Sequence, residues 1–281
     1  MIGDPTFWTS RVAVPRAYRT CRYGGGQVTR DKHGGASLEA IVESGDLGLP
    51  ILHPGGLEST RQLAELCRVA PGQLLLDVAS GTGESACYLA EKFGCRVIGI
   101  DHSVHMIDTA KKKAEGRGLA IEFKLGDARD LPFEAQTFDA VISECTTCAL
   151  DKPRVTSEMM RAAKRGGYVG ISDLYWKEQT PERLKVKLVE LENEHPETLA
   201  GWVHLFEQAG LREIQTKDLS GALATMAKEM KKELGLSGEA RVLLRILTRW
   251  GVRSLPRVLA SQRLFRNRYL GYAIIVGRRF A

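Results

Sequence analysis

Three acidic residues stand at the ends of successive apolar runs, and their chemistry suits a nucleoside. Asp77 lies in the first run, Asp101 ends the second run, and Asp127 follows the third. A carboxylate in such a position accepts hydrogen bonds from ribose hydroxyls or from an adenine amino group. Gly81 and Gly83 follow the first run and allow the backbone to approach a ligand closely. Together these residues predict a nucleoside-binding site.

The glycine turn after the first run matches neither of the common phosphate-binding motifs. The dinucleotide fingerprint G-x-G-x-x-G would require a further glycine at position 86, and this residue is Ala86. The sequence also contains no G-x-x-x-x-G-K-[ST] motif for a triphosphate. A nucleoside without a pyrophosphate therefore fits the turn better.

The elements that must position these residues alternate between short apolar runs and segments of helical periodicity. The expected strands span 74–79, 96–101, 121–125, 138–143, 168–174, 211–219 and 269–276, and the expected helices span 57–69, 84–93, 103–115, 153–164 and 198–209. Buried strands that alternate with helices are typical of a parallel α/β sheet. Because the carboxyl ends of parallel strands form one ligand-binding edge, the three carboxylates are expected to lie together.

This arrangement resembles the class I methyltransferases that depend on S-adenosylmethionine (SAM). The likeness covers about residues 57–219 and rests on Leu74–Gly83, Asp101, Gly126-Asp127, Leu131-Pro132-Phe133 and Phe138-Asp139. It implies a Rossmann-like, seven-stranded α/β sheet with helices on both faces. It also implies N-terminal and C-terminal helical lids around the crevice.

The resemblance also assigns cofactor roles to individual positions. Asp77 and the turn after it would face the methionine part of SAM, Asp101 the ribose, and Asp127 the adenine. The residues expected to contact SAM are Asp77, Ala79, Gly81, Thr82, Gly83, Asp101, His102, Met106, Asp127, Ala128 and Ser143. Ala79 departs from the family, which usually has glycine there, but alanine is a small replacement.

The methyl acceptor is expected to meet the segment Ser143–Cys148 after the fourth strand. Methyltransferases acting on DNA bases or protein glutamine carry Asn/Asp-Pro-Pro-Tyr/Phe at this place, and that motif is absent. The sequence therefore predicts transfer of a methyl group from SAM to a small-molecule acceptor by in-line displacement. Glu144 is the candidate base or acceptor-orienting group, and it is equally well placed to complete the cofactor pocket.

Cys145 and Cys148 form a C-x-x-C pair, which resembles the cysteine that arsenite methyltransferases place after their fourth strand. Thiolates here, joined by Cys21, would suit a thiophilic acceptor, and Cys145 and Cys148 are both candidate catalytic groups. The alternative is that both are small buried residues that pack a loop. No second pair accompanies them, so no metal is expected. A SAM-binding module without turnover is a further alternative.

The excess positive charge belongs to one segment. The chain has 40 Lys and Arg against 34 Asp and Glu, and residues 220–281 hold 13 of the former and 3 of the latter. This distribution argues against a general nucleic-acid binder. Five arginines spaced by four residues over 241–257 predict a cationic amphipathic helix, bent or broken before Pro256. Such a helix favours an anionic or amphipathic acceptor or peripheral membrane contact, or it is a solvated face on the sheet edge.

Four segments are expected to make up the chain. They are an N-terminal lid (1–56), the SAM-binding core (57–219), a basic helical cap (220–268) and a final core strand (269–281). The six cysteines are too few for a disulfide scaffold, and neither a signal peptide nor an uninterrupted apolar stretch of membrane-spanning length is present. We therefore expect a cytoplasmic protein, and the sequence leaves its oligomeric state open.

Overall fold

A computed structural model describes residue 41 and residues 53–280. Most of the expected N-terminal lid, including Cys21, lies outside these residues. Within them, Ile41 is buried against Ile246, Trp250 and Val258 of the C-terminal helices.

A mixed sheet with the strand order β3-β2-β1-β4-β5-β8-β7 forms the centre of the molecule. The strands are β1 (Leu74–Val78), β2 (Arg96–Asp101), β3 (Glu122–Leu125), β4 (Phe138–Glu144), β5 (Ala163–Trp176), β7 (Leu211–Asp218) and β8 (Leu270–Arg279). All pairs from β3 to β5 are parallel, and β8 runs antiparallel to β5 and β7. The expected Rossmann-like, seven-stranded α/β sheet is confirmed, and a two-residue strand, β6 (Glu197–Thr198), pairs with the end of β5 as an eighth.

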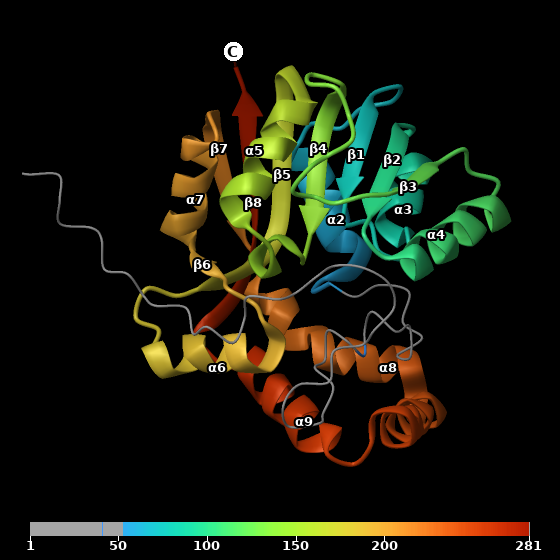
Figure 1. The fold of residues 1–281 in the computed structure, drawn as a ribbon, viewed down its shortest axis with the longest axis vertical. Coiled ribbons are helices and arrows are strands. Elements are labelled where there is room, and N and C mark those ends of the chain that lie inside the picture. Colours follow the sequence, from blue (N-terminus) through green and yellow to red (C-terminus); the bar gives the residue numbers. More distant parts are fainter. Residues whose placement is uncertain (1–40, 42–52, 281) are drawn as a thin grey trace, which may run out of the picture.

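Helices cover both faces of this sheet, as expected (Figure 1). One face packs against α2 (Gly56–Leu66), α3 (Glu84–Phe93) and α4 (Val104–Gly116), and the other against α5 (Lys152–Ala162) and α7 (Leu199–Gln208). Apolar side chains from both faces of the strands fill two separate cores, which explains the nearly continuous apolar runs in their sequences.

The predicted boundary between the fourth helix and the fifth strand is wrong by several residues. The helix ends at Ala162 rather than at 164, and β5 begins at Ala163 rather than at 168. Ala163 pairs with Phe138 and Tyr168 with Ala140, so residues 164–167 form a β-bulge opposite one residue of β4. The charged and glycine-rich sequence of this bulge conceals a strand because it lacks an alternating apolar pattern.

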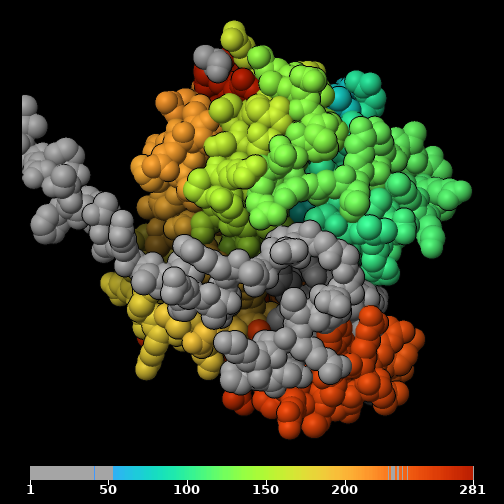
Figure 2. Space-filling view, viewed as in Figure 1, coloured from blue at the N-terminus to red at the C-terminus, as the bar shows by residue number. Residues whose placement is uncertain are grey.

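The C-terminal helices gather beyond the carboxyl ends of β1, β2 and β4, together with α6 (Glu182–Glu192) (Figure 1). They are α8 (Ser220–Arg245), a π-helical turn (Ile246–Trp250) and α9 (Ser254–Phe265). In the space-filling view they form an orange and red block below the sheet (Figure 2).

The helix expected over 241–257 is not continuous. It breaks at Gly251, where φ is +80°, and so before Pro256 as expected. The five arginines therefore do not form one stripe. Arg257 lies in α9 and donates hydrogen bonds to the carbonyl oxygen of Leu191 at the end of α6, which ties the two helices together.

Among residues 53–280, none of the helices has both the length and the apolar character needed to cross a bilayer.

Candidate cofactor-binding and catalytic site

The strand order reverses between β1 and β4, and this is the point where open α/β sheets bind ligands. Strands β1, β2 and β3 lie side by side in chain order, and β4 then pairs with the other side of β1. Val78 pairs with Ile100 on one side and with Ser143 on the other. This register brings the ends of β1, β2 and β4, with Asp101 and Glu144, to the same edge.

The turn after β1 requires the left-handed backbone region at three positions. Ala79, Gly81 and Gly83 have φ values of +59°, +52° and +75°. A Cβ at Gly81 would meet no atom within 4 Å, so the backbone there borders open space. A Cβ at Gly83 would lie 2.8 Å from Ala110 and Phe123, so this glycine is needed for packing of the turn against α4 and β3. Gly81 is thus the position of this turn at which a ligand has room to approach the backbone.

Asp101, the last residue of β2, forms a hydrogen bond with the turn after β1. Its Oδ2 accepts a hydrogen bond of 2.9 Å from the Gly81 N–H, and its Oδ1 accepts one of 2.8 Å from the Ser103 N–H. Ser103, rather than Asp101, caps α4 by accepting from the Met106 N–H. Because each carboxylate oxygen can accept a second bond, Asp101 retains the capacity to bind a pair of ribose hydroxyls.

Asp77 is a buried carboxylate with an unsatisfied oxygen. Its exposed fraction is 2%, and its Oδ2 has no hydrogen-bond partner. Burial, and then the nearby carboxylates of Glu144 and Asp101, raise the pKa of Asp77 well above the usual range for a carboxyl group. A buried polar atom left unpaired is costly, so a cationic or hydrogen-bonding ligand group fits this position. The amino group of SAM has that chemistry.

The third expected carboxylate has a different environment. Asp127 is half-exposed, and both of its oxygens accept hydrogen bonds from the side chain of Arg129, at 2.6 to 3.0 Å. These bonds, opposed by partial burial, lower the pKa of Asp127. An adenine amino group would therefore meet a carboxylate that Arg129 already neutralises in part.

The remaining expected cofactor residues lie in several different environments. His102 is exposed beside Asp101, with 3.6 Å between His102 Nδ1 and Asp101 Oδ1. Thr82 accepts a hydrogen bond from Lys113 at 3.0 Å. The side chains of Met106, Ala128 and Ser143 are buried.

Glu144, the candidate catalytic carboxylate, lies in a cluster of polar side chains. Thr60 and Ser85 donate to its Oε2 at 3.0 and 2.7 Å, and Ser172 donates to its Oε1 at 3.2 Å. The Nε2 of His53 lies 3.5 Å from Oε2, while its Nδ1 is buried without a hydrogen-bond partner. Glu144 is therefore held in one orientation beside an imidazole that has an unused nitrogen.

The two candidate cysteines lie beside this cluster. Cys145 has a φ of +54°, and its N–H donates to the Ser172 carbonyl oxygen at 2.7 Å. Burial and the nearby Asp173 carboxylate raise the pKa of both the Cys145 and Cys148 thiols, and the Cys148 thiol donates to Asp173. Both are therefore protonated thiols at neutral pH. In the described part of the chain, no cluster of His, Cys, Asp or Glu is arranged to hold a metal ion.

Sequence patterns did not identify several members of this site. Ser85 is the second residue of α3 and Thr60 the fifth residue of α2, and neither belongs to a motif; Arg129 follows Asp127 by two residues. Ser85 lies two residues after Gly83, on the first turn of a helix that starts at the crevice. This position was the only sequence signal that could have identified it as a site residue. Thr60 had none, because only the packing of α2 brings it to β4.

Residues 75–167 match the family described as a methyltransferase domain. Phosphoethanolamine N-methyltransferase 1 of Arabidopsis thaliana is 31% identical over 172 residues, which cover 61% of this chain and 35% of that protein. An arsenite methyltransferase of Halobacterium salinarum is 29% identical over 170 residues, covering 59% of this chain and 39% of that protein. This chain spans only 25% to 36% of the length of the phosphoethanolamine N-methyltransferases that it matches.

A solved structure with the same fold is phosphoethanolamine N-methyltransferase 2 of Haemonchus contortus, in complex with phosphomonomethylethanolamine and S-adenosylhomocysteine. The TM-score is 0.72 at 18% identity, with 86% of this chain and 58% of that chain covered.

Proposed function

Since the chain belongs to the class I SAM-dependent methyltransferases, we propose that it transfers the methyl group of SAM to a small-molecule acceptor. The proposal is carried by two carboxylates together: Asp77, buried with an unsatisfied Oδ2, and Asp101, whose oxygens accept from the backbone N–H groups of Gly81 and Ser103. These groups suit the two polar ends of SAM, its amino acid and its ribose.

The proposed cofactor residues would each contact a different part of SAM. Asp77 would accept from the amino group, Gly81 would give the backbone room to approach, and Asp101 would bind the ribose. Met106, Ala128 and Asp127 would border the adenine. When bound, SAM supplies a methyl group activated by its positively charged sulfur. Positioning an acceptor in line with that methyl group, and excluding water, are then the tasks of this chain.

Glu144 and His53 are the proposed groups that handle a proton of the acceptor. The hydrogen bonds from Thr60, Ser85 and Ser172 leave Glu144 little rotational freedom, and His53 Nε2 lies next to it. An acceptor hydroxyl or ammonium group must lose a proton as it takes the methyl group, so a fixed carboxylate–imidazole pair is suited to receive it.

The acceptor is proposed to carry an anionic group and to enter from the side of the C-terminal helices. Residues 220–268, taken as a cap, lie beyond the carboxyl ends of the parallel strands (Figure 1). They carry most of the excess positive charge in the sequence. The names of relatives specify phosphoethanolamine, whose phosphate has this character. Peripheral contact with an anionic membrane is a second proposed role of the cap, since Leu243, Leu244 and Val252 are exposed there.

A thiophilic acceptor is the second candidate, because an arsenite methyltransferase is among the relatives. Cys145 and Cys148 would have to lose their protons to bind it, and their raised pKa values oppose this. We favour an oxygen or nitrogen acceptor for that reason. A reducing, cytoplasmic location is proposed as well, consistent with five described cysteines that are free thiols.

The test of the proposal is calorimetric titration with SAM and S-adenosylhomocysteine. Wild-type protein should bind both, and Asp101→Ala should lose at least about tenfold in affinity, since it removes a charged acceptor of two hydrogen bonds. Asp108→Ala removes an exposed carboxylate from α4 and should bind as wild type. No binding by the wild-type protein, or equal binding by both variants, would contradict the proposal.

Turnover with a panel of acceptors separates the two candidate chemistries. For an oxygen or nitrogen acceptor, Glu144→Gln should lower kcat by about 10²-fold or more while Cys145→Ser stays near the wild-type rate. For a thiophilic acceptor, Cys145→Ser should lower kcat and Glu144→Gln should stay near the wild-type rate. Affinity for S-adenosylhomocysteine serves as the folding control in both variants. Wild-type binding of SAM without product from any acceptor would instead favour a module without turnover.

A further inference from the structure

The end of the sheet opposite the cofactor crevice has a feature that the proposed function does not use. A cavity of about 340 Å³ opens there, and its lining residues are Arg68, Gln73, Asp139, Lys164, Arg165, Gly166, Gly167, Tyr168 and Arg278. Asp139 is the second residue of β4, whereas Glu144 is its last. Five residue steps along an extended strand separate these positions by roughly 17 Å, so the cavity and the crevice are distinct.

The β-bulge of β5 builds one wall of this cavity. Gly166 has a φ of +79°, and a Cβ at Gly167 would lie only 2.7 Å from the Asp139 carbonyl oxygen. The backbone at Gly166 therefore favours glycine, and the close contact at Gly167 leaves no room for a side chain. Bulges commonly redirect side chains next to functional sites, and here the bulge turns Lys164 and Arg165 out of the strand pairing.

Basic side chains dominate the lining, with four of them against the single carboxylate of Asp139. Lys164 pairs with Asp139 at 2.8 Å, and Arg278 lies 3.5 Å from Glu213. Within the described part of the chain, no carboxylate pairs with Arg68 or Arg165. The cavity therefore carries an excess of positive charge.

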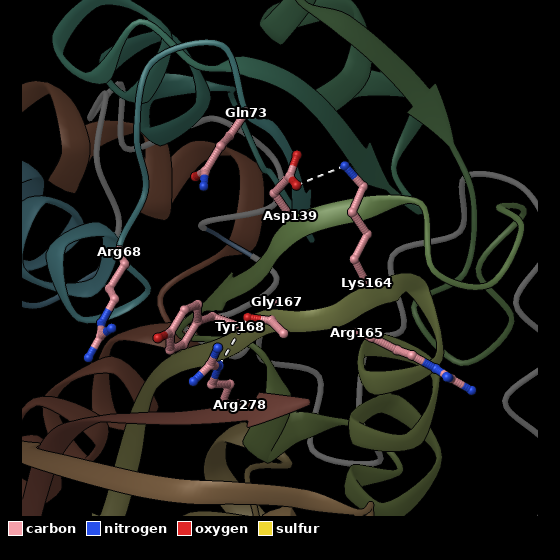
Figure 3. Close-up of a pocket in the computed structure, with 9 residues that line it drawn as sticks. Arg68, Gln73, Asp139, Lys164, Arg165, Gly167, Tyr168 and Arg278 are labelled. Atoms are coloured by element: carbon pink, nitrogen blue, oxygen red, sulfur yellow. Dashed lines mark hydrogen bonds and ion pairs between the residues drawn. The ribbon is translucent and has the colours of Figure 1, made fainter. Parts of the chain in front are cut away.

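Tyr168 holds two guanidinium groups in place (Figure 3). The guanidinium carbons of Arg68 and Arg278 lie 5.7 and 5.8 Å from the centre of its ring. Arg278 also donates to the Gly166 carbonyl oxygen at 3.2 Å. Stacking of this kind fixes the planar fork of an arginine and lowers the entropy that it loses on binding an anion.

The positive charge of Arg165 also affects Arg279, a nearby arginine. Burial, and then the positive charge of Arg165, lower the pKa of Arg279 in the next position of β8. An anion in the cavity would relieve this repulsion between like charges.

We propose that this cavity binds the phosphate group of a small ligand such as pyrophosphate or a phosphomonoester. Arginine is the side chain best matched to phosphate oxygens, because its parallel N–H groups form paired, charge-assisted hydrogen bonds. The cavity volume falls in the range of ordinary small-ligand sites. This site is independent of the proposed methyl transfer, since none of its lining residues belongs to the cofactor crevice.

Calorimetric titration with sodium pyrophosphate tests this site, with S-adenosylhomocysteine present to occupy the crevice. Wild-type protein should bind with an affinity that falls as sodium chloride is raised. Arg68→Gln and Arg165→Gln should each weaken binding, and together by at least about tenfold. Arg266→Gln makes the same charge change at an exposed position next to the end of α9 and should leave binding unchanged.

Two further measurements control for misfolding of the variants and identify the source of the phosphate group. Arg165 is exposed, so its variant is expected to fold even if Arg68→Gln does not, and thermal unfolding checks both. Binding to phosphatidic acid vesicles but not to soluble pyrophosphate, lost in the same variants, would assign the phosphate to a lipid headgroup. Absence of both kinds of binding in the wild type, or binding that neither variant weakens, would overturn the proposal.

Discussion

The carboxylates of the crevice differ in how far the protein already satisfies them. Asp101 is anchored by two backbone N–H groups and Asp127 by the Arg129 side chain, whereas Asp77 keeps one oxygen unpaired in a buried position. Buried polar groups in native proteins are nearly always paired, and exceptions point to function. The unpaired oxygen of Asp77 therefore lowers the stability of the unliganded protein, and we expect a ligand to bind there.

Replacing Asp77 with asparagine should stabilise the unliganded protein at neutral pH. A raised native pKa means that the folded state binds more protons than the unfolded state above the usual carboxyl range. The free energy of unfolding then falls as the pH rises from the unfolded pKa toward the native pKa, by about 1.4 kcal/mol for each pH unit in that window, and an amide removes this loss. Thermal unfolding of Asp77→Asn and wild type at pH 5 and pH 8 measures the difference, which should be larger at pH 8.

The same variant should bind SAM more weakly, by about tenfold or more, because an amide offers the cationic amino group no charge. Asp108→Asn, an exposed position, should change neither property. A lower unfolding temperature together with unchanged affinity would show that Asp77 serves the fold rather than the ligand.

At the scale of elements, the turn between β1 and α3 combines two kinds of glycine. Gly81 faces open space, while Gly83 is pressed against Ala110 of α4 and Phe123 of β3. The sequence motif did not distinguish them. Only the packing of α4 and β3 against the turn shows that one glycine is available to a ligand and the other holds the elements together.

Gly83→Ala should destabilise the protein by roughly 1–3 kcal/mol, because the new Cβ overlaps two neighbours and the backbone is left-handed there. Gly116→Ala is the matched control. It lies at the end of α4 with no atom within 4 Å of the added Cβ, so it should be neutral or slightly stabilising. Urea unfolding of both variants measures the change. Equal midpoints would mean that the turn shifts to make room.

For the molecule as a whole, positive charge gathers in two separate regions, the cap beyond the carboxyl ends of the parallel strands (Figure 1) and the cavity at the opposite end of the sheet. The cap carries Arg241, Arg245, Arg249 and Arg253 at exposed positions together with Leu243, Leu244 and Val252. Arginines beside exposed apolar residues are typical of segments that lie on anionic membranes. The cavity around Tyr168 instead holds its arginines in a recess, which suits a small anion.

Vesicle sedimentation tests the proposed membrane contact of the cap. At low salt the protein should sediment with vesicles containing phosphatidylglycerol, and Leu244→Glu should abolish this because it places a negative charge at the lipid surface. Leu125→Glu alters a residue of similar exposure, 55% against 60%, outside the cap and should sediment as wild type. Sedimentation that resists salt, or equal losses in both variants, would argue against this contact.

The sequence by itself determined the order of the elements and the positions of the strand-end residues, because both follow from short-range patterns of apolar and turn residues. Asp77, Gly81 and Asp101 could be predicted as candidate cofactor residues this way. Only the tertiary structure decided which carboxylate is left unpaired and has a raised pKa, since burial and neighbouring charges come from distant segments. The same holds for the cluster of His53, Thr60 and Ser85 around Glu144. It holds also for the cavity around Tyr168, whose arginines come from positions 68, 165 and 278, far apart in the sequence.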